Sequence, residues 1–360
     1  MRGAWRKNEP VPDICPEELD RALDCIVSMG AAPLIWPRIR HVLDSAHTRP
    51  AEALRAAYHE TVLDNKRFRP QLLAALASIL EQGGIEPLTF KGWSLAQYYH
   101  PPALRPLGDI DICVPAGRYA DAVKLIATHT GQSPSSQPDE STSLTLKDPR
   151  TGRLGVVDLQ VDLARFRLEP LAEVFERSQK IQVSGRTLRI PCPEDHLRLL
   201  CLHFLGHGGC RPVWLCDVAA MLEAETDGFD WNLCLGDDPL TTHWIGLVIL
   251  LAHTLLGAKI DSVPEQYRKT KLPTWLVPMI FRQWSKPLSE HRAPEVFSHV
   301  LRRTPNKIGP AVFARWPDPI TARFQAGAWY DERPRWPYQM AYFFRKGAAF
   351  AGKTFQSLDK

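Results

Sequence analysis

The chain contains 360 residues, of which 44% are apolar and 23% are charged. These values are typical of folded globular proteins, so they exclude a long disordered chain and leave room for two or three packed units. The net charge of +4 is small for this length, and it argues against a dedicated nucleic-acid-binding protein, whose affinity comes from many phosphate contacts.

Residues 1–84 are predicted to form helices. Leu19, Leu23 and Ile26 recur at helical spacing after a proline and two acids, and the helical pattern continues until Gly83–Gly84 ends it. No catalytic motif occurs in this part, so we interpret it as a cap or packing domain.

Residues 85–191 show a different pattern, typical of an α/β or α+β unit. A short strand at 87–90, a turn at Lys91–Gly92 and a brief helix at 94–99 come first. A polar loop is expected at 131–143. The other predicted elements are a strand at 109–114, a helix at 118–128, strands at 144–147 and 154–163 joined around 148–152, and a hairpin at 181–190 that turns at Ser184–Gly185.

Residues 192–360 read as helices. The segment Pro193-Glu-Asp195 starts a helix that runs to about His207, where Gly208–Gly209 ends it. Further helices are predicted at 213–224, 241–256, 275–284 and 336–349.

The start of the chain and its longest apolar run bear on location. Residues 1–22 contain no secretion-signal pattern, and the apolar run at 244–256 is shorter than the roughly 20 residues that span a bilayer. We therefore expect a cytoplasmic protein with no transmembrane segment, in which the eight cysteines are reduced thiols.

Two predicted strands carry acids on one face. Because side chains alternate along a strand, Asp109 and Asp111 project together while the isoleucines between and after them enter the core. In the second strand Asp158, Gln160 and Asp162 share a face in the same way. Neighbouring carboxylates repel each other, and Mg²⁺ relieves that repulsion because it prefers hard oxygen ligands and accepts phosphate oxygens as further ligands. The third acid can complete a metal site and accept a proton from an attacking hydroxyl.

The Lys91–Gly92 turn is the predicted phosphate-binding element. Gly92 permits close approach of the backbone, and the free amides at the start of the helix that includes Trp93 can bind phosphate oxygens. The Ser94 hydroxyl is a further donor. Lys91 and Arg105 are candidates for binding the triphosphate through their charge, with surface side chains as the alternative interpretation.

At these residues the chain resembles the nucleotidyltransferase superfamily related to DNA polymerase beta, and in particular the group of uncharacterised nucleotidyltransferase family proteins. Members of that group carry Leu-Lys-Gly, Arg-x-x-Gly-Asp-Ile-Asp and Asp-Leu-His, followed by a Pro-Glu-Asp helix with two histidines and a Trp-Leu-x-Asp segment. The matching residues here, within roughly 70–350, are Phe90-Lys-Gly92, Arg105-Pro-Leu-Gly-Asp-Ile-Asp111, Asp158-Leu-Gln160, Pro193-Glu-Asp195 with His203 and His207, and Trp214-Leu-Cys-Asp217.

The resemblance implies a polymerase-beta-like α+β fold with a mixed sheet. A catalytic domain at 85–191 lies between an N-terminal helical segment at 1–84 and a C-terminal helical domain at 192–360. Asp109, Asp111 and Asp158 are the implied catalytic acids and ligands of Mg²⁺ or Mn²⁺, and Asp162 is a further candidate.

The implied reaction begins with a metal-bound nucleoside triphosphate, with ATP as the favoured donor. An acceptor hydroxyl attacks the α-phosphorus and pyrophosphate leaves. The acceptor is expected to be a small molecule or peptide, in natural-product or polysaccharide tailoring.

Two residues depart from the family pattern. Trp93 follows the glycine where Gly or Ser is usual, which leaves Ser94 as the nearest substitute. Gln160 stands where the group has histidine, which weakens a proton-shuttle role at that position.

Two other functions remain open. One is a nucleotidyltransferase of a toxin-antitoxin type that modifies a protein or RNA, although the modest charge disfavours RNA. The other is a non-enzymatic nucleotide-binding protein, which the intact acids disfavour.

Two further groups of residues have alternative interpretations. His196, His203 and His207 fall near one helix face and Cys210 and Cys216 follow, so a zinc site is one hypothesis, although the spacing fits no common zinc pattern. The other is that His203, His207 or Asp217 lines the acceptor pocket. The aromatic and basic stretch 329–346 is interpreted as a helix packed on the core, with a membrane contact or a partner groove as alternatives.

Overall fold

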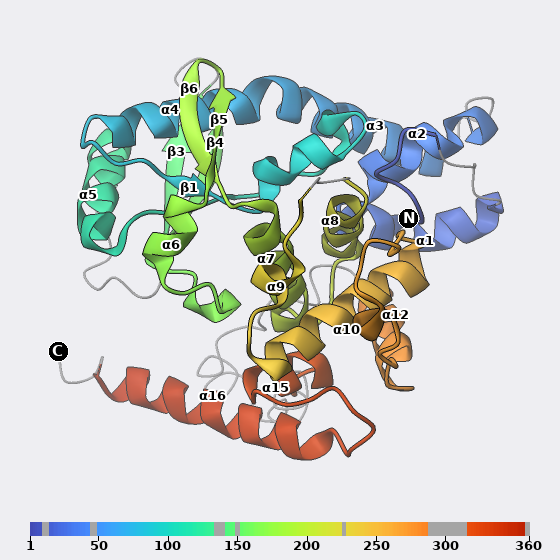
Figure 1. Cartoon of the computed structure of the whole chain (residues 1–360). Coiled ribbons are helices and arrows are strands. Elements are labelled where there is room, and N and C mark those ends of the chain that lie inside the picture. The colour runs from blue at the N-terminus through green and yellow to red at the C-terminus, as the bar shows by residue number, and fades with distance from the viewer. Residues whose placement is uncertain are drawn as a thin grey trace.

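Helices fill the N-terminal part of the chain, as the periodicity of residues 1–84 predicts (Figure 1). The computed structural model describes residues 1–8, 14–43, 49–132, 141–147, 152–224, 228–286 and 315–356. Leu19 and Leu23 are buried in a small core between the first helices. The helices are α1 (Pro16–Ser28), α2 (Ala32–Leu43), α3 (Arg49–Leu63) and α4 (Arg69–Glu81), with a π-helical segment, Asp64–Phe68, before α4.

A six-stranded mixed sheet follows, with the strand order β3-β4-β2-β1-β6-β5. Strands β1 and β6 pair in parallel, as do β2 and β4, and the other pairs are antiparallel. The predicted α+β class with a mixed sheet is therefore confirmed. The strands are β1 (Leu88–Thr89), β2 (Ile110–Cys113), β3 (Ser141–Lys147), β4 (Leu154–Gln160), β5 (Gln179–Val183) and β6 (Arg186–Ile190).

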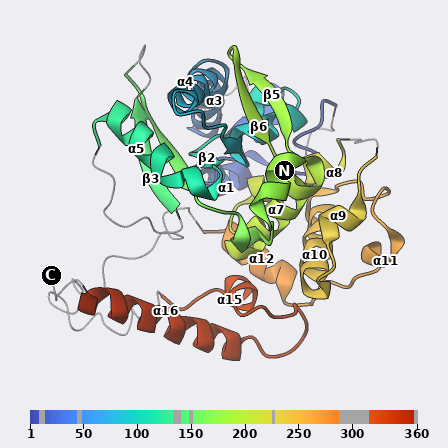
Figure 2. The same cartoon turned by 60° about the vertical axis from the view of Figure 1, so that its left-hand side comes forward.

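Helix α4 and helix α5 (Tyr119–Thr130) pack on one face of the sheet, and α5 lies beside β3 and β2 (Figure 2). Ile110 and Ile112 of β2 enter this core together with Val157 and Leu159 of β4. Because neighbouring residues of a strand face opposite ways, the intervening side chains of β2 and β4 project from the other face of the sheet. That face is turned toward the C-terminal helices.

The C-terminal helices share one large core with residues of the central unit such as Phe90, Cys113 and Leu163. Helix α10 is long and apolar enough to cross a membrane, but 61% of its apolar window is buried inside the fold, which is typical of a core helix. The helices after β6 are α7 (Pro193–Gly206), α8 (Pro212–Leu222), α9 (Trp231–Leu235), α10 (Pro239–Leu256), α11 (Glu265–Arg268), α12 (Leu276–Trp284), α15 (Pro319–Gln325) and α16 (Trp336–Gln356); α6 (Leu171–Glu176) precedes β5.

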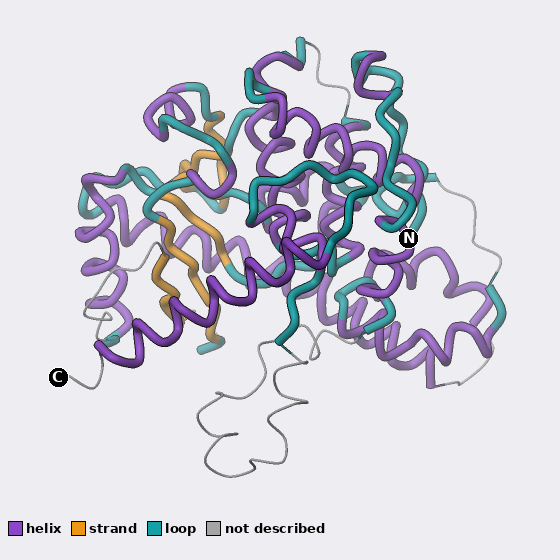
Figure 3. Tube along the Cα trace, turned by 90° about the horizontal axis from the view of Figure 1, so that it is seen from below, coloured by secondary structure: helices purple, strands orange, loops and turns teal. Residues whose placement is uncertain are grey.

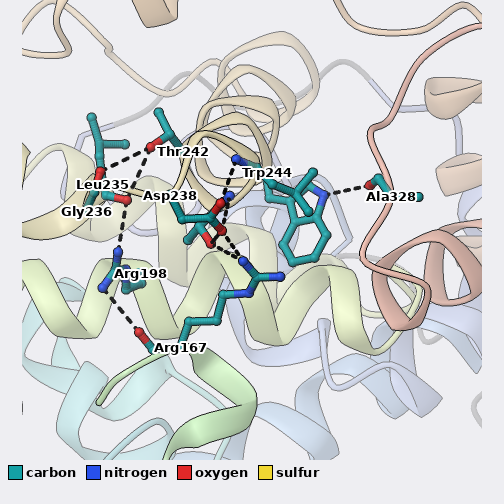
Figure 4. A network of polar contacts seen from close by, with 10 residues as sticks. Arg167, Arg198, Leu235, Gly236, Asp238, Thr242, Trp244 and Ala328 are labelled. Carbon is teal, nitrogen blue, oxygen red and sulfur yellow. Dashed lines mark hydrogen bonds and ion pairs between the residues drawn. The ribbon is translucent and has the colours of Figure 1, made fainter. Parts of the chain in front are cut away.

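A polar network fastens the segment after β4 to these helices (Figure 4). Arg167 pairs with Asp238 at the start of α10, and its guanidinium carbon lies 4.6 Å from the ring centre of Trp244. Arg198 of α7 donates to the Arg167 carbonyl oxygen at 3.2 Å and to the Leu235 carbonyl oxygen at 2.9 Å. The network holds α7, α9 and α10 against the central unit.

Two predicted boundaries in the acidic part of the sheet are wrong, and the helix predicted at 336–349 continues to Gln356. The predicted strand 154–163 ends at Gln160, because Asp162 accepts a hydrogen bond from the Ala164 amide at 3.0 Å and starts a short 3-10 turn. Residues 141–143, expected in a loop, begin β3 because they pair with β4. Residues 133–140 of that predicted loop and 148–151 of the predicted connection lie outside the described residues.

Candidate active site

Three carboxylates meet on the open face of the sheet, where the alternation of the two acidic strands predicts them. Strands β2 and β4 pair in parallel with Asp111 opposite Asp158, and Asp109 stands two residues before Asp111. One carboxylate oxygen of each residue lies within 4.8 Å of the others. Asp109 is exposed, Asp158 is half-buried and Asp111 is buried, so the cluster opens to solvent at one side.

The pKa of Asp111 is raised to about 6. Burial is the main cause, the nearby Lys91 acts in the opposite direction, and the charges of Asp109 and Asp158 act with burial. The Lys91 Nζ atom lies 2.7 Å from Asp111 Oδ1. The Lys91 side chain therefore contacts one of the acids directly, where the sequence predicted a phosphate contact.

The Asp158 carboxylate is oriented by two neighbours. Gln160 donates from Nε2 to Asp158 Oδ2 at 2.7 Å, and the Ser143 hydroxyl donates to Oδ1 at 3.3 Å. Gln160 is buried, and the sequence treated it only as a departure from histidine. Strand alternation, which puts Gln160 on the same face as Asp158, could have indicated this hydrogen bond from the sequence. The hydrogen bond itself also depends on where β4 ends.

The glycine turn lies directly beside the acids. Gly92 has a φ of +44°, and a Cβ placed there would meet the Asp109 carbonyl oxygen at 3.5 Å. Lys91 also adopts a positive φ, of 59°, and is followed by a 3-10 helix over Gly92–Tyr98. The backbone of this bend therefore closely approaches the first acid, and its left-handed conformation suits glycine.

Ser94 and Trp93 have other contacts than those expected. The buried Ser94 hydroxyl donates to the Lys91 carbonyl oxygen at 2.6 Å and lies 3.3 Å from His196 Nε2. The same ring nitrogen accepts the Lys91 amide hydrogen, at 3.4 Å. Trp93 packs partly buried against the core under α4. Ser94 thus closes the bend, and the Lys91 amide links the bend to helix α7.

Arg105 forms a buried ion pair with Asp217 of α8. Its Nε and Nη2 atoms donate to the two carboxylate oxygens at 3.0 and 2.7 Å. The Tyr99 hydroxyl donates to the same carboxylate at 2.7 Å. Arg105 and Asp217 are both buried, and in this structure their charged groups are directed at each other.

His203, His207 and Trp214 form an aromatic group on the helical side. The ring centres of the two histidines lie 4.4 Å apart, and that of Trp214 lies 4.5 Å from His203. Burial and then the Lys91 charge keep the pKa of His203 well below its usual range. The pKa of His207 falls to about 4 through desolvation and then Lys91, although part of the residue is exposed, and Asp109 acts in the opposite direction. The Lys91 side chain, which pairs with Asp111, thus also acts on both histidines.

The described residues form one group of three or more His, Cys, Asp or Glu side chains able to hold a metal ion, and it is Asp109, Asp111 and Asp158. The zinc hypothesis for His196, His203, His207, Cys210 and Cys216 is therefore wrong, because among the described residues no three of these side chains come together, although the His203 and His207 rings are adjacent. Asp162 also lies outside the acidic group, since its carboxylate caps the Ala164 amide.

Comparisons with known proteins identify a family for this chain. The sequence model of a protein family described as "Uncharacterised nucleotidyltransferase" matches residues 16–267. A search of the curated proteins finds no match. Among solved structures, the chain is similar to an antigenic nucleotidyltransferase-like protein from Paracoccidioides brasiliensis, with 15% identity, a TM-score of 0.36, and coverage of 54% of this chain and 94% of that chain.

Proposed function

Because the chain belongs to the uncharacterised nucleotidyltransferase family, we propose that it is a metal-dependent enzyme that transfers a nucleoside monophosphate from a nucleoside triphosphate to a hydroxyl group. The observation that carries the proposal is the convergence of Asp109, Asp111 and Asp158 on adjacent strands. The glycine bend at Gly92 supports it, because the backbone there passes beside the first acid.

The donor set fits a hard divalent cation. Three carboxylates and the single ammonium of Lys91 form the centre of the site, so the ionised groups leave about two negative charges uncompensated. Asp109, Asp111 and Asp158 would hold Mg²⁺ or Mn²⁺, which prefer such oxygen ligands. When bound, the cation would neutralise phosphate oxygens and bring the triphosphate to the site.

The chain's own residues supply positioning and a proton acceptor. Asp158, held by Gln160 and Ser143, would accept the proton of the acceptor hydroxyl. The hydroxyl oxygen forms a bond to the α-phosphorus, the bond from that phosphorus to the bridging oxygen breaks, and pyrophosphate leaves with the electron pair. The bend at Lys91–Gly92 would place its backbone beside the phosphates, and His207 would face the acceptor.

The finer parts of the proposal come from the family resemblance. We assign ATP as the donor, and a small-molecule or peptide hydroxyl as the acceptor, in natural-product or polysaccharide tailoring. A cytoplasmic location suits the eight free cysteines, because thiols stay reduced there.

The direct test is pyrophosphate release with Mg²⁺, α-labelled nucleoside triphosphates and a panel of hydroxyl acceptors. Asp109→Asn and Asp111→Asn are expected to abolish label transfer, since each removes a charged ligand. Asp162→Asn is the matched control, because this acid lies near the end of β4 but outside the acidic group.

Transfer that survives both ligand substitutions would refute the assignment. Tight triphosphate binding without turnover on any acceptor would favour a non-enzymatic nucleotide-binding protein. Label transferred to the protein itself or to RNA would point to the modifying type of enzyme.

A further inference from the structure

Helix α16 lies at the edge of the molecule and is packed on one side (Figures 1 and 3). The ring centre of Phe343 lies 5.6 Å from that of Trp316. Gln339 donates from Nε2 to the Pro317 carbonyl oxygen at 2.7 Å. These contacts fix the helix to the segment that leads into α15.

The other side of α16 exposes large apolar side chains to solvent. Trp336, Met340 and Phe344 are 61%, 36% and 63% exposed. A spacing of four residues brings them onto one helix face. The smaller residues that share this exposure are Pro337, Ala341, Gly347 and Ala348. Such a continuous apolar face on a folded protein marks an interaction surface.

The charge around this face has one sign. Residues 333–356 include five basic residues and no acid. The nearest preceding acids are already engaged: Asp331 pairs with Arg323, and Glu332 accepts hydrogen bonds from Thr274. Arg345 and Lys346 follow Phe344 and are exposed; both lie over the Tyr342 ring, and Arg345 Nη2 also donates to the Gln325 carbonyl oxygen at 3.1 Å. An apolar face that contains Trp and Phe, bordered by basic residues, is the pattern of a helix that lies in the interface of a membrane.

We propose that α16 binds the surface of an anionic lipid bilayer, with Trp336, Met340 and Phe344 inserted below the headgroups. Arg345 and Lys346 contact the negatively charged headgroups. Pairing with a second copy is disfavoured by charge, because a parallel arrangement brings Arg345 and Lys346 against their own copies. An antiparallel arrangement brings them against the basic residues that begin the helix.

The test uses the full chain and sedimentation with vesicles. Vesicles contain either phosphatidylcholine alone or phosphatidylcholine with phosphatidylglycerol. The wild-type chain is expected to sediment with the anionic vesicles and to be released by salt. Combined substitution of Trp336→Gln, Met340→Gln and Phe344→Gln is expected to weaken binding roughly tenfold or more.

Two further variants separate the contributions. The matched control replaces three exposed apolar side chains on other helices, Val27→Gln, Leu63→Gln and Phe281→Gln, and is expected to bind as wild type does. Arg345→Gln with Lys346→Gln is expected to lower affinity for anionic vesicles roughly tenfold and to leave binding to neutral vesicles unchanged.

Three results would overturn the proposal. The wild-type chain could stay in the supernatant with both lipids. The triple α16 variant, shown to be folded by its thermal unfolding, could bind as wild type does. Finally, the wild-type chain could be a dimer without lipid affinity that the triple variant converts to a monomer, in which case the face joins two copies.

Discussion

Removing the carboxylate of Asp217 should destabilise the protein strongly, because it leaves Arg105 buried and unpaired. The two side chains are 0% and 6% exposed, and Asp217 accepts two hydrogen bonds from Arg105 and one from Tyr99. We consider Asp217→Leu, which keeps a side chain of similar size and removes all three acceptor contacts.

The expected cost is about 3–5 kcal/mol, the range for breaking a buried ion pair from one side. Replacing both partners removes the unpaired charge, so Asp217→Leu with Arg105→Met should recover most of this loss. A loss of about 1–3 kcal/mol in the free energy of unfolding should remain, since the buried Tyr99 hydroxyl still lacks its acceptor.

Urea unfolding followed by circular dichroism measures these differences as shifts of the midpoint at constant slope. The matched control is the ion pair between Arg49 and Asp24, whose side chains are 70% and 79% exposed. Asp24→Leu is expected to change the free energy of unfolding by about 0–1 kcal/mol.

Two results would refute the reasoning. If Asp217→Leu stayed within about 1 kcal/mol of wild type, the pair would not be buried in solution as it is in the structure. If Arg105→Met kept wild-type stability but lost triphosphate binding, Arg105 would bind phosphate as its sequence position suggested.

Three other substitutions test the site. Gln160→Leu removes the donor that orients Asp158, and we expect the rate of nucleotidyl transfer to fall roughly 10- to 100-fold with little change in thermal unfolding. Gln160→His restores a donor, so it should retain more activity than Gln160→Leu in steady-state assays of pyrophosphate release. Gly92→Ala places a side chain at a φ of +44°, so we expect a loss of about 1–3 kcal/mol in urea unfolding, and an unchanged midpoint would mean that the bend is relaxed. Burial and then the Arg105 charge lower the pKa of His196 to about 3, so the unfolded chain binds a proton below pH 6.5 that the folded chain does not. His196 alone should therefore lower stability by about 1.4 kcal/mol per pH unit from pH 6.5 toward 3. The depressed pKa values of His203 and His207 add to this loss, and His196→Gln should lessen the total slope between pH 6.5 and 5 in urea titrations.

The acidic strands could be predicted from sequence because their faces follow from alternation alone. Ile110 and Ile112 identify the face of β2 that packs against α4 and α5, and this places Asp111 on the opposite face. The meeting with Asp158 required only that β2 and β4 be neighbours, which the order of the elements favours. The family model over residues 16–267 independently supports this part of the chain.

The partners of the two basic side chains could not be predicted in the same way. Lys91 lies in the glycine bend and Arg105 follows it in sequence, and both were candidates for binding phosphate. Asp217, the partner of Arg105, is 112 residues further along the chain, and no local pattern identifies a contact across that distance. The zinc hypothesis failed for a similar reason. Helical spacing does bring the His203 and His207 rings together, but a third ligand depends on contacts between elements, and none of the described residues supplies one.

These distant contacts also give the motifs on helices α7 and α8 a structural role beside the acidic strands. The segment between β1 and β2 carries the glycine bend, and the C-terminal helices hold it at both ends. His196 of α7 accepts the Lys91 amide hydrogen at the start of the segment, and Asp217 of α8 binds Arg105 near its end. The phosphate-binding conformation proposed for the bend thus depends on α7 and α8 as much as on its own glycine. A variant that loosens either helix should weaken triphosphate binding even when all three acids are intact, because the backbone beside Asp109 would no longer be held in place.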